Sequence, residues 1–579
     1  MSLVPEEPLF LLDARDGFVF ERTGALLGDR ERLKRLRSVR GVACGDIAGL
    51  SVASARVPRL VEETYRGPAV RVRTAYGRSL TVTGDRLLFV HSHGRLVSRR
   101  AVDLQVGDLV ALGRRLPRPD EPCTEIDLVR LLWERGHADA VRVEGEPIRR
   151  LLALKAARRQ PAMLRRDEER VRLPREAWKR LARARRARGI TGTDMAQRIG
   201  YRQACSISEF ETCRSLPPAK AFRAYLGALG EQWPPEAVIV ASQVDRWAAV
   251  DSANARYRAI SPATWLASLD ASDLRWLDRQ PDKRDLVLYT RAHREGAVPR
   301  FRAVTTELCY ALGWYLAEGS VSSRGARLNY SLGVDDDRYL PGLRAAIAAF
   351  GEGTAALHMP KGRPKSRHLY VQAPIAVRMI KALGLGGTAL AKRIPDLIFK
   401  CPEECQQAFL EGYYLGDGTK QTEGRRLEFG TSSPDLAVGL LHLLAQFGVV
   451  ASLFRRPGGV FTIRGEAVHT QPSFAVVITS VQGLQKLSWL WRQAPSAAAY
   501  DRRISDPVRP GHDEWVSDTV MSVPVREVEV FDYEGPVYDV PVGDGYAVIA
   551  GTGGFLSRSS GRRDARSGRR VLRLGGVRG

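Results

Sequence analysis

Two stretches of this chain, Ala311–Gly319 (ALGWYLAEG) and Leu410–Gly418 (LEGYYLGDG), follow one pattern, and each ends in an acid followed by glycine. Small residues recur among large apolar ones at helical spacing, which lets two helix backbones approach closely. Each stretch therefore predicts a helix that ends near its acid, with the glycine turning the chain out of it. Two such helices packed side by side would bring Glu318 and Asp417 together at one end of a shared seam.

The two acids would lie close enough to repel each other. Such a pair is unfavourable unless cations lie between the carboxylates, so the arrangement predicts a divalent-metal site at Glu318 and Asp417. The alternative is an ordinary pair of core helices whose terminal acids are merely exposed. Because the pattern occurs twice in the chain, we favour the metal site over that alternative.

The doubled pattern resembles the LAGLIDADG family of homing endonucleases in its two-motif, single-chain form. The resemblance implies that Glu318 and Asp417 are catalytic and hold Mg²⁺ (or Mn²⁺), and that the substrate is double-stranded DNA. Leu390–Phe399 (LAKRIPDLIF) resembles the basic block of the intein-encoded, DOD-type enzymes, which implies a catalytic role for Lys392. Leu427–Leu453 resembles the strand, turn and helix that follow the second motif in those enzymes.

Length and charge restrict the class of protein. A chain of 579 residues is too long for one hydrophobic core and predicts three or more domains. The 89 Lys and Arg residues exceed the 65 Asp and Glu residues, and the net charge of +24 predicts a polyanionic partner, for which nucleic acid is the obvious candidate. The alternative is that the excess charge is only solvated surface.

The sequence indicates neither secretion nor membrane insertion. The first residues do not resemble a signal peptide, and no apolar run approaches the length of a membrane span. We therefore expect a cytoplasmic monomer with no membrane partner, associated with the nucleoid when bound to DNA. The seven cysteines are odd in number and scattered, which argues against a disulfide framework. We interpret the CxxxC pair Cys401 and Cys405 as reduced structural thiols.

Both ends of the chain are rich in predicted β-strands. Val70–Val90, for example, alternates β-branched and polar residues across a turn, as a hairpin does. Four stretches resemble blocks of the Hint fold, the self-splicing module of inteins: Val70–Val90, Ala101–Leu112, Gly535–Val542 and Gly551–Ser560. The resemblance implies one split, all-β Hint-like domain built from residues 1–118 and 515–560. The alternative is an unrelated β-rich domain at each end.

The resemblance to inteins assigns the splicing chemistry to Ser2, Thr83, Arg86, Arg558, Ser559 and Ser560. An intein needs a nucleophile at its first residue, a histidine in the first hairpin, and a terminal His-Asn pair whose asparagine cyclises. Arg86 stands where the histidine is expected, and arginine cannot be deprotonated near neutral pH. Ser559 stands where the asparagine is expected, and it has no amide nitrogen for a succinimide. We therefore expect a degenerate splicing centre; rescue by a nearby histidine such as His91 is the lesser alternative.

Residues 119–300 form a charged, mostly helical insert in this interpretation. Within it, Ile190–Leu216 resembles the helix-turn-helix of phage-repressor-like DNA-binding domains. Five apolar residues would make the inner faces of its two helices: Met195, Ala196, Ile199, Ile207 and Phe210. The resemblance implies that Arg202 and Gln203 face the major groove, where such side chains contact phosphates and base edges. The alternative is a helical hairpin with a purely structural role.

Residues 301–495 contain both motifs, and the resemblance implies a two-repeat αββαββα endonuclease domain. Alternating segments predict the strands of an antiparallel saddle that lies on DNA: Ala326–Val334, His368–Gln372, Arg425–Phe429 and Val460–Arg464. Basic residues in the connections match a phosphate-contacting footprint: Lys361, Arg363, Lys365, Arg367, Arg455 and Arg456. Taken singly, each of these residues is most simply solvated surface.

These features predict a multidomain α+β protein. It would comprise the split Hint-like domain, the helical insert, the two-repeat endonuclease domain, and a basic tail at 561–579 that we expect to lack regular structure. The function favoured is a site-specific homing endonuclease that makes a metal-dependent double-strand cut and has lost splicing. Two alternatives stay open, which are a catalytically silent DNA-binding regulator and an intein still competent for splicing.

Overall fold

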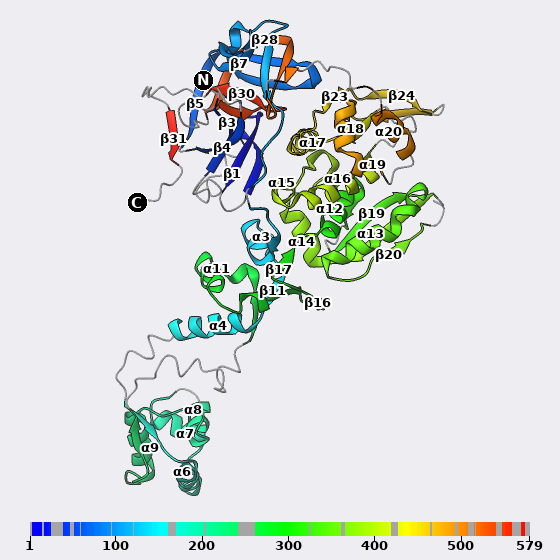
Figure 1. The fold of residues 1–579 in the computed structure, drawn as a ribbon. Helices are drawn as coiled ribbons and strands as arrows, with labels where there is room; N and C mark the ends of the chain where they lie inside the picture. Colours follow the sequence, from blue (N-terminus) through cyan, green and yellow to red (C-terminus); the bar gives the residue numbers. More distant parts are fainter. Residues whose placement is uncertain are drawn as a thin grey trace. The chain divides into compact units, whose positions relative to one another are not determined.

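The computed structural model has strands from both ends of the chain and mixed α and β elements between them (Figure 1). It describes all residues except 1–2, 14–16, 25–38, 47–50, 58, 94, 120, 160–168, 202–203, 241–260, 323–325, 361–364, 419–425, 464–465, 493–495, 506, 508–513, 516, 540–546, 559–568 and 574–579. The chain divides into two compact units, Met1–Val141 with Leu288–Gly579, and Arg142–Val287. The predicted multidomain α+β class is confirmed. Within the residues described, no helix is long and apolar enough to cross a membrane.

Strands from both ends of the chain form one antiparallel assembly, which we call the terminal β-domain. Its strands are β1 (Pro8–Asp13), β2 (Gly17–Arg22), β3 (Val39–Asp46), β4 (Ser51–Val57), β5 (Arg59–Thr74), β6 (Ser79–Thr83), β7 (Leu87–Ser92), β8 (Arg95–Arg100), β9 (Leu109–Gly113), β27 (Glu514–Trp515), β28 (Val520–Asp539), β29 (Ala547–Ala550), β30 (Phe555–Arg558) and β31 (Arg569–Arg573). The long strand β28 pairs with both β5 and β9, and β30 pairs with β7. A backbone ladder thus joins the two ends of the chain, as a domain divided in sequence requires.

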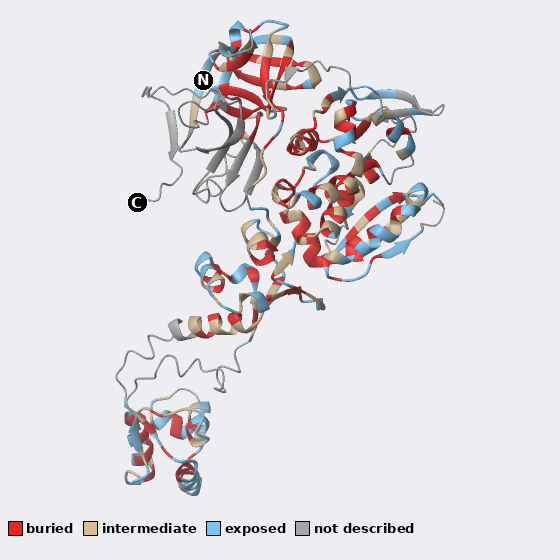
Figure 2. Ribbon diagram, in the orientation of Figure 1, coloured by how far each residue is buried: buried red, intermediate tan, exposed pale blue. Residues whose placement is uncertain are grey.

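The interior of the terminal β-domain is filled by alternate residues of these strands. Val70 and Val72 of β5, Val82 of β6 and Val110 of β9 are completely buried (Figure 2). Because side chains alternate between the faces of a strand, this set matches the period of two seen in the sequence. The predicted hairpin is confirmed, since a 3₁₀ turn at Ala75–Gly77 joins β5 to β6.

Part of the basic tail forms a strand, so the expectation that the tail lacks regular structure is wrong. Strand β31 pairs antiparallel with β5, and its register sets Arg569 and Arg570 opposite Glu63 and Glu62. Composition favoured disorder because few residues of the tail are apolar. A low apolar content does not prevent pairing, because the edge of a neighbouring strand offers backbone hydrogen bonds to any sequence.

The first half of the two-repeat domain follows the αββαββα order. Its elements are α12 (Thr306–Glu318), β18 (Gly319–Val321), β19 (Arg327–Gly333), α13 (Leu340–Ile347), β20 (Ala356–His358), β21 (Ser366–Gln372) and α14 (Pro374–Ala382). The strands form an antiparallel sheet in the order β18-β19-β21-β20. Before α12, the chain forms β10 (Glu125–Asp127), α3 (Leu128–Glu134) and β17 (Phe301–Ala303), and β10 pairs with β17.

The second half has a related but altered order. Its elements are α15 (Asp396–Lys400), α16 (Glu403–Asp417), β22 (Leu427–Thr431), α17 (Pro434–Gln446), β23 (Ser452–Arg456), β24 (Gly459–Ile463), β25 (Glu466–Thr470), β26 (Ser473–Ile478), α18 (Val481–Lys486), α19 (Ser488–Trp491) and α20 (Ala497–Ile504). Its sheet has the order β22-β26-β23. The segment Val460–Arg464, predicted as a saddle strand, instead contributes to a separate β24–β25 hairpin. That prediction is wrong because alternation alone does not say which strand is the partner.

Within the unit Arg142–Val287 lies a helical module closed by two short strands. The module comprises β12 (Arg170–Arg172), α6 (Arg175–Ala187), α7 (Gly192–Arg198), α8 (Cys205–Glu211), α9 (Ala219–Leu229) and β13 (Val238–Val240). Strand β12 pairs antiparallel with β13, so the module starts and ends at one place. Its own core contains Trp178, Ile207 and Phe222. The same unit also contains α4 (Glu146–Arg159), β14 (Ala263–Trp265) and α11 (Ala271–Asp278).

Candidate active site

Helices α12 and α16 pack along a seam of small residues. A Cβ atom added to Gly313 would lie 2.1 Å from the carbonyl oxygen of Phe409, and one added to Gly412 would lie 2.3 Å from that of Tyr310. No side chain fits at such separations, so glycine permits an approach that other residues would block. Both helices are largely buried along this contact (Figure 2). The prediction that small residues bring the two motif helices together is confirmed.

The two acids lie at the same end of this seam. A Cβ atom added to Gly416 would lie 2.4 Å from the Cβ of Ala317 and 3.5 Å from the Cγ of Glu318. Glu318 of α12 is therefore next to the residue that precedes Asp417 on α16. Asp417 is exposed and Glu318 is partly exposed, so both carboxylates are open to solvent and to a ligand. The structure brings the acids together, and their catalytic role stays a prediction.

The glycines that follow the acids do not act as predicted. Gly319 and Gly418 have φ values of −85° and −74°, so neither takes the left-handed conformation of a helix-ending glycine. Glycine is required at both positions because there is no room for a side chain. A Cβ atom would lie 2.3 Å from the Tyr315 ring in the first case and 2.2 Å from the Tyr414 ring in the second. The two motif helices thus end in the same way, so each acid has the same position relative to the end of its helix.

Lys392 lies at the same end of the seam. Its Nζ donates to the carbonyl oxygens of Leu316 at 2.7 Å and Ala317 at 3.2 Å, in the last turn of α12. A helix C-terminus attracts a cation because its carbonyl groups are unpaired. Burial lowers the pKa of Lys392, whereas the charges of Asp417 and Glu318 raise it. Lys392 is therefore within electrostatic reach of both acids, as the predicted site requires.

Ser433 positions this lysine, and the sequence reasoning missed it. The Ser433 hydroxyl donates to the backbone carbonyl oxygen of Lys392 at 2.6 Å, and the Ser433 hydroxyl oxygen accepts from the backbone N–H of Leu436 at 3.2 Å. Ser433 is the N-cap of α17, so one buried side chain links the start of that helix to the basic block. The signal in the sequence was a serine directly before a proline and an apolar run.

The chemistry of the donors fits a hard divalent cation. Carboxylate and carbonyl oxygens converge at this end of the seam, and Mg²⁺ prefers oxygen ligands. Among the residues that the structure describes, no group of three or more Asp, Glu, His or Cys side chains is arranged to hold a metal ion. A centre with two acids leaves coordination positions for water and for phosphate oxygens, which is how Mg²⁺ is commonly bound beside nucleic acid and nucleotides.

The CxxxC pair lies near the other end of the two helices. Cys401 and Cys405 are buried free thiols, and Cys309 of α12 joins them. Hydrogen bonds with Cys401 and Cys405, together with burial, raise the pKa of Cys309 well above the usual thiol range. The cluster packs the start of α12 against the start of α16, in agreement with a structural role.

Two of the predicted DNA contacts are engaged in ion pairs within the protein. Arg367 Nε lies 3.0 Å from Asp337 Oδ1, and Arg456 Nη2 lies 2.6 Å from Glu428 Oε1. Each pair would have to exchange for a phosphate contact on binding. The other two described positions, Lys365 and Arg455, are exposed. Four predicted contacts lie outside the described residues: Lys361, Arg363, Arg202 and Gln203.

One face of the first sheet carries polar side chains that the sequence reasoning missed. The register of β19 and β21 pairs Arg327 with Gln372, Asn329 with Tyr370, and Ser331 with His368. The intervening residues Leu328, Tyr330 and Leu332 are buried against the helices, so the other set faces outward. The alternation within Arg327–Gly333 predicted a strand of the saddle on DNA, but it did not single out these side chains.

The predicted splicing centre is a buried ion pair. The Arg86 side chain is completely buried, with Nη1 2.7 Å from Asp539 Oδ1 and Nη2 2.9 Å from the Ser557 hydroxyl oxygen. Asp539 ends β28 and Ser557 lies on β30, so Arg86 joins the two ends of the chain. Arg558 is exposed, and the Thr83 hydroxyl donates to Asp85 at 2.7 Å. Ser2, Ser559 and Ser560 lie outside the described part of the chain.

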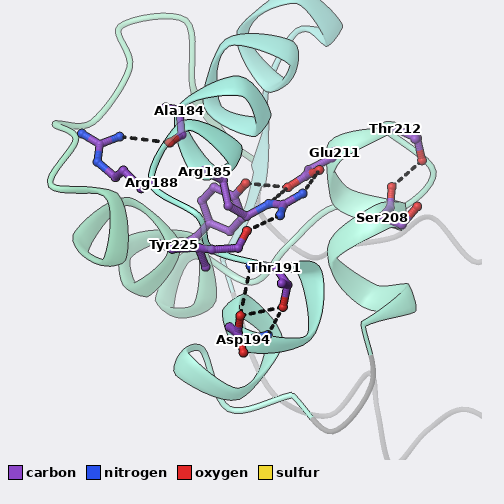
Figure 3. Close-up of polar contacts among 10 residues, drawn as sticks. Ala184, Arg185, Arg188, Thr191, Asp194, Ser208, Glu211, Thr212 and Tyr225 are labelled. Atoms are coloured by element: carbon purple, nitrogen blue, oxygen red, sulfur yellow. Dashed lines mark hydrogen bonds and ion pairs between the residues drawn. The ribbon is translucent and has the colours of Figure 1, made fainter.

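In the helical module, α7 and α8 form the hairpin that the sequence favoured. Met195, Ala196, Ile207 and Phe210 are buried, and the turn contains Gly200 with φ +82°. A capping box at Thr191 and Asp194 begins α7 (Figure 3). Ile199 is only partly buried. The hairpin geometry therefore forms, and a DNA-reading role for it stays a prediction.

A buried network fixes helix α8 in this module. Arg185 of α6 donates to both carboxylate oxygens of Glu211 on α8, at 2.7 and 3.0 Å, and the Tyr225 hydroxyl of α9 donates to Glu211 at 2.7 Å (Figure 3). A bidentate pair in a low-dielectric interior restricts orientation as well as distance. Helix α8 is thus tied to two other helices, with Ser208 and Thr212 on its exposed side.

A known family matches the second half of the two-repeat domain. Residues 404–486 match the family model described as a LAGLIDADG-like domain. The chain contains a LAGLIDADG-like domain. The matched part begins within α16, whose last residue is Asp417, and ends at Lys486, the last residue of α18.

Relatives of the chain include two archaeal polymerases. The chain is 25% identical to the DNA polymerases of Thermococcus hydrothermalis over 599 residues and of Thermococcus kodakarensis over 606, covering 96% of this chain and 32% of each relative. The chain therefore spans about a third of their length. Among solved structures it is similar to I-DmoI in complex with DNA and Ca (14% identity, 34% of this chain, 98% of that chain, TM-score 0.24), and to the transcription factor IIB Mvu mini-intein (18%, 20%, 71%, 0.17).

Proposed function

We propose that the protein is an intein-derived homing endonuclease that makes a site-specific, metal-dependent double-strand cut in DNA. The observation that carries the proposal is the convergence of Glu318, Asp417 and Lys392 at one end of the seam between the motif helices. The LAGLIDADG-like match over residues 404–486 supports the enzyme class. The net charge of +24 supports a polyanionic substrate.

Each half of the seam supplies one acid to the proposed reaction. Glu318 and Asp417 would hold Mg²⁺ or Mn²⁺, and one acid from each repeat suits the hydrolysis of one phosphodiester in each strand. When bound, such an ion activates a water molecule and stabilises the leaving oxygen. Lys392 places a positive charge beside both carboxylates, and we assign it to the charge that develops on the scissile phosphate. Backbone carbonyls and Ser433 hold that lysine in place before substrate arrives.

The direct test is selection of cleaved sequences. Purified protein would be incubated with Mg²⁺ and a randomised duplex library, and the new ends would be sequenced. We expect double-strand ends at a small set of related sequences, absent in EDTA and absent with the Glu318→Gln variant. Selective binding without cutting would favour the catalytically silent regulator. If the protein neither cuts nor binds any sequence selectively, both the proposal and the regulator alternative are overturned.

We assign the terminal β-domain to a Hint fold that has lost splicing. Arg86 occupies the position of the expected histidine and is paired with Asp539. Because a guanidinium does not release a proton near neutral pH, it cannot replace the histidine in proton transfer. The alignment coverage supports an intein origin. A match that takes in 96% of this chain but 32% of a DNA polymerase is what an element carried within a longer protein would give.

Mass spectrometry of the expressed chain tests the loss of splicing. We expect the chain to be intact through Gly579, apart from removal of Met1, because Ser559 cannot cyclise. The combined variant Arg86→His, Arg558→His and Ser559→Asn restores the missing side chains. Cleavage between positions 559 and 560 in that variant alone would show that only those groups are lacking. Release of the tail from the unaltered chain would favour an intein that still splices.

The helical module is proposed as a second DNA contact. Its support is the hairpin of α7 and α8, with α8 held rigidly by Glu211 and carrying small hydroxyl side chains on its exposed side. A rigid helix with short polar side chains can approach a groove closely and place neighbouring longer side chains on base edges. Such a contact would add affinity and sequence selectivity without taking part in hydrolysis.

A further inference from the structure

Arg78 is a buried cation with incomplete hydrogen bonding. It follows the 3₁₀ turn at Ala75–Gly77 in the terminal β-domain and is only 4% exposed. Its Nη2 donates to the carbonyl oxygen of Ala451 at 2.7 Å, but within the described residues its Nε and Nη1 have no hydrogen-bond partner. Burial lowers its pKa to about 10, so the group is still charged at neutral pH. A buried guanidinium with two unpaired donors requires a partner.

A small cavity adjoins this guanidinium, between the terminal β-domain and α17. Its lining includes Arg78, Arg114 and His442, and among the residues that the structure describes no Asp or Glu side chain is part of it. About 10 Å³ is open to the centre of a water-sized sphere, which is room for about one such particle. Leu441 and Met521 add apolar surface to the lining. The cavity thus combines positive charge with small size.

His442 does not supply the missing negative charge. Burial, together with the nearby Arg78, holds the pKa of His442 well below the ordinary histidine range, so the ring is neutral at neutral pH. Its Nε2 accepts a hydrogen bond from the backbone N–H of Gly553 at 3.4 Å. Arg114 adds a second positive charge, and its Nη1 donates to the carbonyl oxygen of Asp518 at 3.1 Å. The lining is therefore positive overall.

We propose that this cavity binds a monovalent anion of halide size, with chloride as the occupant in ordinary salt solutions. A halide accepts hydrogen bonds from both Nε and Nη1 of Arg78 and balances its charge, whereas water accepts hydrogen bonds but leaves the charge in place. Phosphate and sulfate are too large for a space of one water molecule. Because the cavity lies between the terminal β-domain and α17, the bound ion also stabilises the contact between them.

Thermal unfolding of the full chain tests the proposal. The midpoint would be measured at constant ionic strength in sodium chloride and in sodium gluconate, whose anion does not fit the cavity. We expect a higher midpoint in chloride, because a ligand that binds only the folded state stabilises it, and we expect Arg78→Met to remove the difference. The control is Arg22→Met, which breaks the 2.5 Å ion pair with Asp435 elsewhere on α17 and should keep the chloride dependence.

A crystal of the unaltered chain grown with sodium bromide gives a second readout that does not depend on the folding of any variant. We expect an anomalous peak within hydrogen-bonding distance of Nε and Nη1 of Arg78. The peak, together with a midpoint that rises in chloride, would establish the site. Equal midpoints in chloride and gluconate with no anomalous peak would overturn it and assign the cavity to water.

Discussion

The chain has two centres built on charged side chains, and they differ in where the charges are balanced. At the end of the helix seam, Glu318 and Asp417 are open to solvent, and Lys392 beside them is held by backbone carbonyls. In the terminal β-domain, Arg86 is completely buried, and Asp539 balances its charge within the fold. A charge left at the surface can still bind a ligand, whereas a charge neutralised inside the fold is not available to one, and removal of its partner destabilises the protein.

Under the proposed function, the difference between the two centres shows how one chain could keep one chemistry and lose another. Replacing a proton-transferring residue by arginine removes reactivity, but a buried arginine also requires a carboxylate partner, and Asp539 provides it. The Arg86–Asp539 pair is part of the structure that joins the two ends of the chain. Mutations at the two centres should therefore have opposite effects: loss of cutting without unfolding at the first, and unfolding without loss of chemistry at the second.

The largest effect should come from the acids at the seam. Glu318→Gln or Asp417→Asn should lower the rate of double-strand cutting by at least about 10³-fold, or ~4 kcal/mol, because each change removes a metal ligand. Affinity for the selected duplex, measured by fluorescence anisotropy, should stay within a few-fold.

Matched controls for the acids exist on the same helices. Glu307→Gln and Glu404→Gln lie in the first turns of α12 and α16, away from the acid end, and should cut like the unaltered protein. Undiminished cutting by either Glu318→Gln or Asp417→Asn would remove that residue from the metal site and weaken the contrast between the two centres.

At the buried centre, Arg86→Met should lower the free energy of unfolding by about 3–5 kcal/mol, because it leaves Asp539 buried and unpaired. The double variant Arg86→Met with Asp539→Leu should recover most of that loss, since neither charge then remains. Urea unfolding measures both. Cutting by the folded variants should be unchanged, and a folded Arg86→Met protein that no longer cuts would link the two centres that we treat as independent.

An intermediate effect is expected at Lys392. Lys392→Met should slow cutting by about 10²-fold, or ~2.7 kcal/mol, by removing the positive charge near the scissile phosphate. Because burial lowers its pKa more than the two acids raise it, the ammonium is lost as pH rises through a value below the usual lysine range. The cutting rate of the unaltered protein should fall over that range, and Lys392→Met should lack this fall. If the cutting rate of Lys392→Met still falls over that pH range, the titrating group is a residue other than Lys392.

The smallest effect should come from the helical module. Replacing Arg202 and Gln203 with alanine should weaken binding to the preferred site by about 1–3 kcal/mol per lost base contact, with little change in the cutting rate at saturating protein. Lys220→Ala, which also removes one positive charge from an exposed position in the module, is the control. Equal affinities and footprints for all three proteins would leave the module with a structural role only.

The acid centre was predictable because its information is local. Helical spacing, small residues and a terminal acid all lie within each nine-residue stretch, and the repetition supplied the pairing of the stretches. The buried centre was not predictable, because the partners of Arg86 lie near the other end of the chain and only the pairing of β28 and β30 with the first strands brings them close. The sequence predicted that Arg86 cannot replace a histidine, but it did not predict the ion pair that Arg86 makes with Asp539.

The proposed DNA surface shows a second limit. Loop cations such as Lys365 were chosen because charge is visible in a sequence, whereas Asn329 and Tyr370 attract no notice until the register sets them side by side. Two of the chosen arginines turn out to be paired with Asp337 and Glu428. Charge alone therefore overestimates the contribution of loops to a proposed DNA surface and underestimates the contribution of strand faces. Which side chains share a strand face depends on the pairing of the strands.

The pairing of β12 with β13 has a consequence for how this chain could be rearranged. Because Arg170 lies opposite Val240, the two ends of the module are adjacent to each other. A short linker could bridge them at a small entropic cost, so excision of residues 170–240 need not disturb what flanks the module. A single insertion or deletion could therefore add or remove the whole module, and an engineered chain could carry a different module between the same two points.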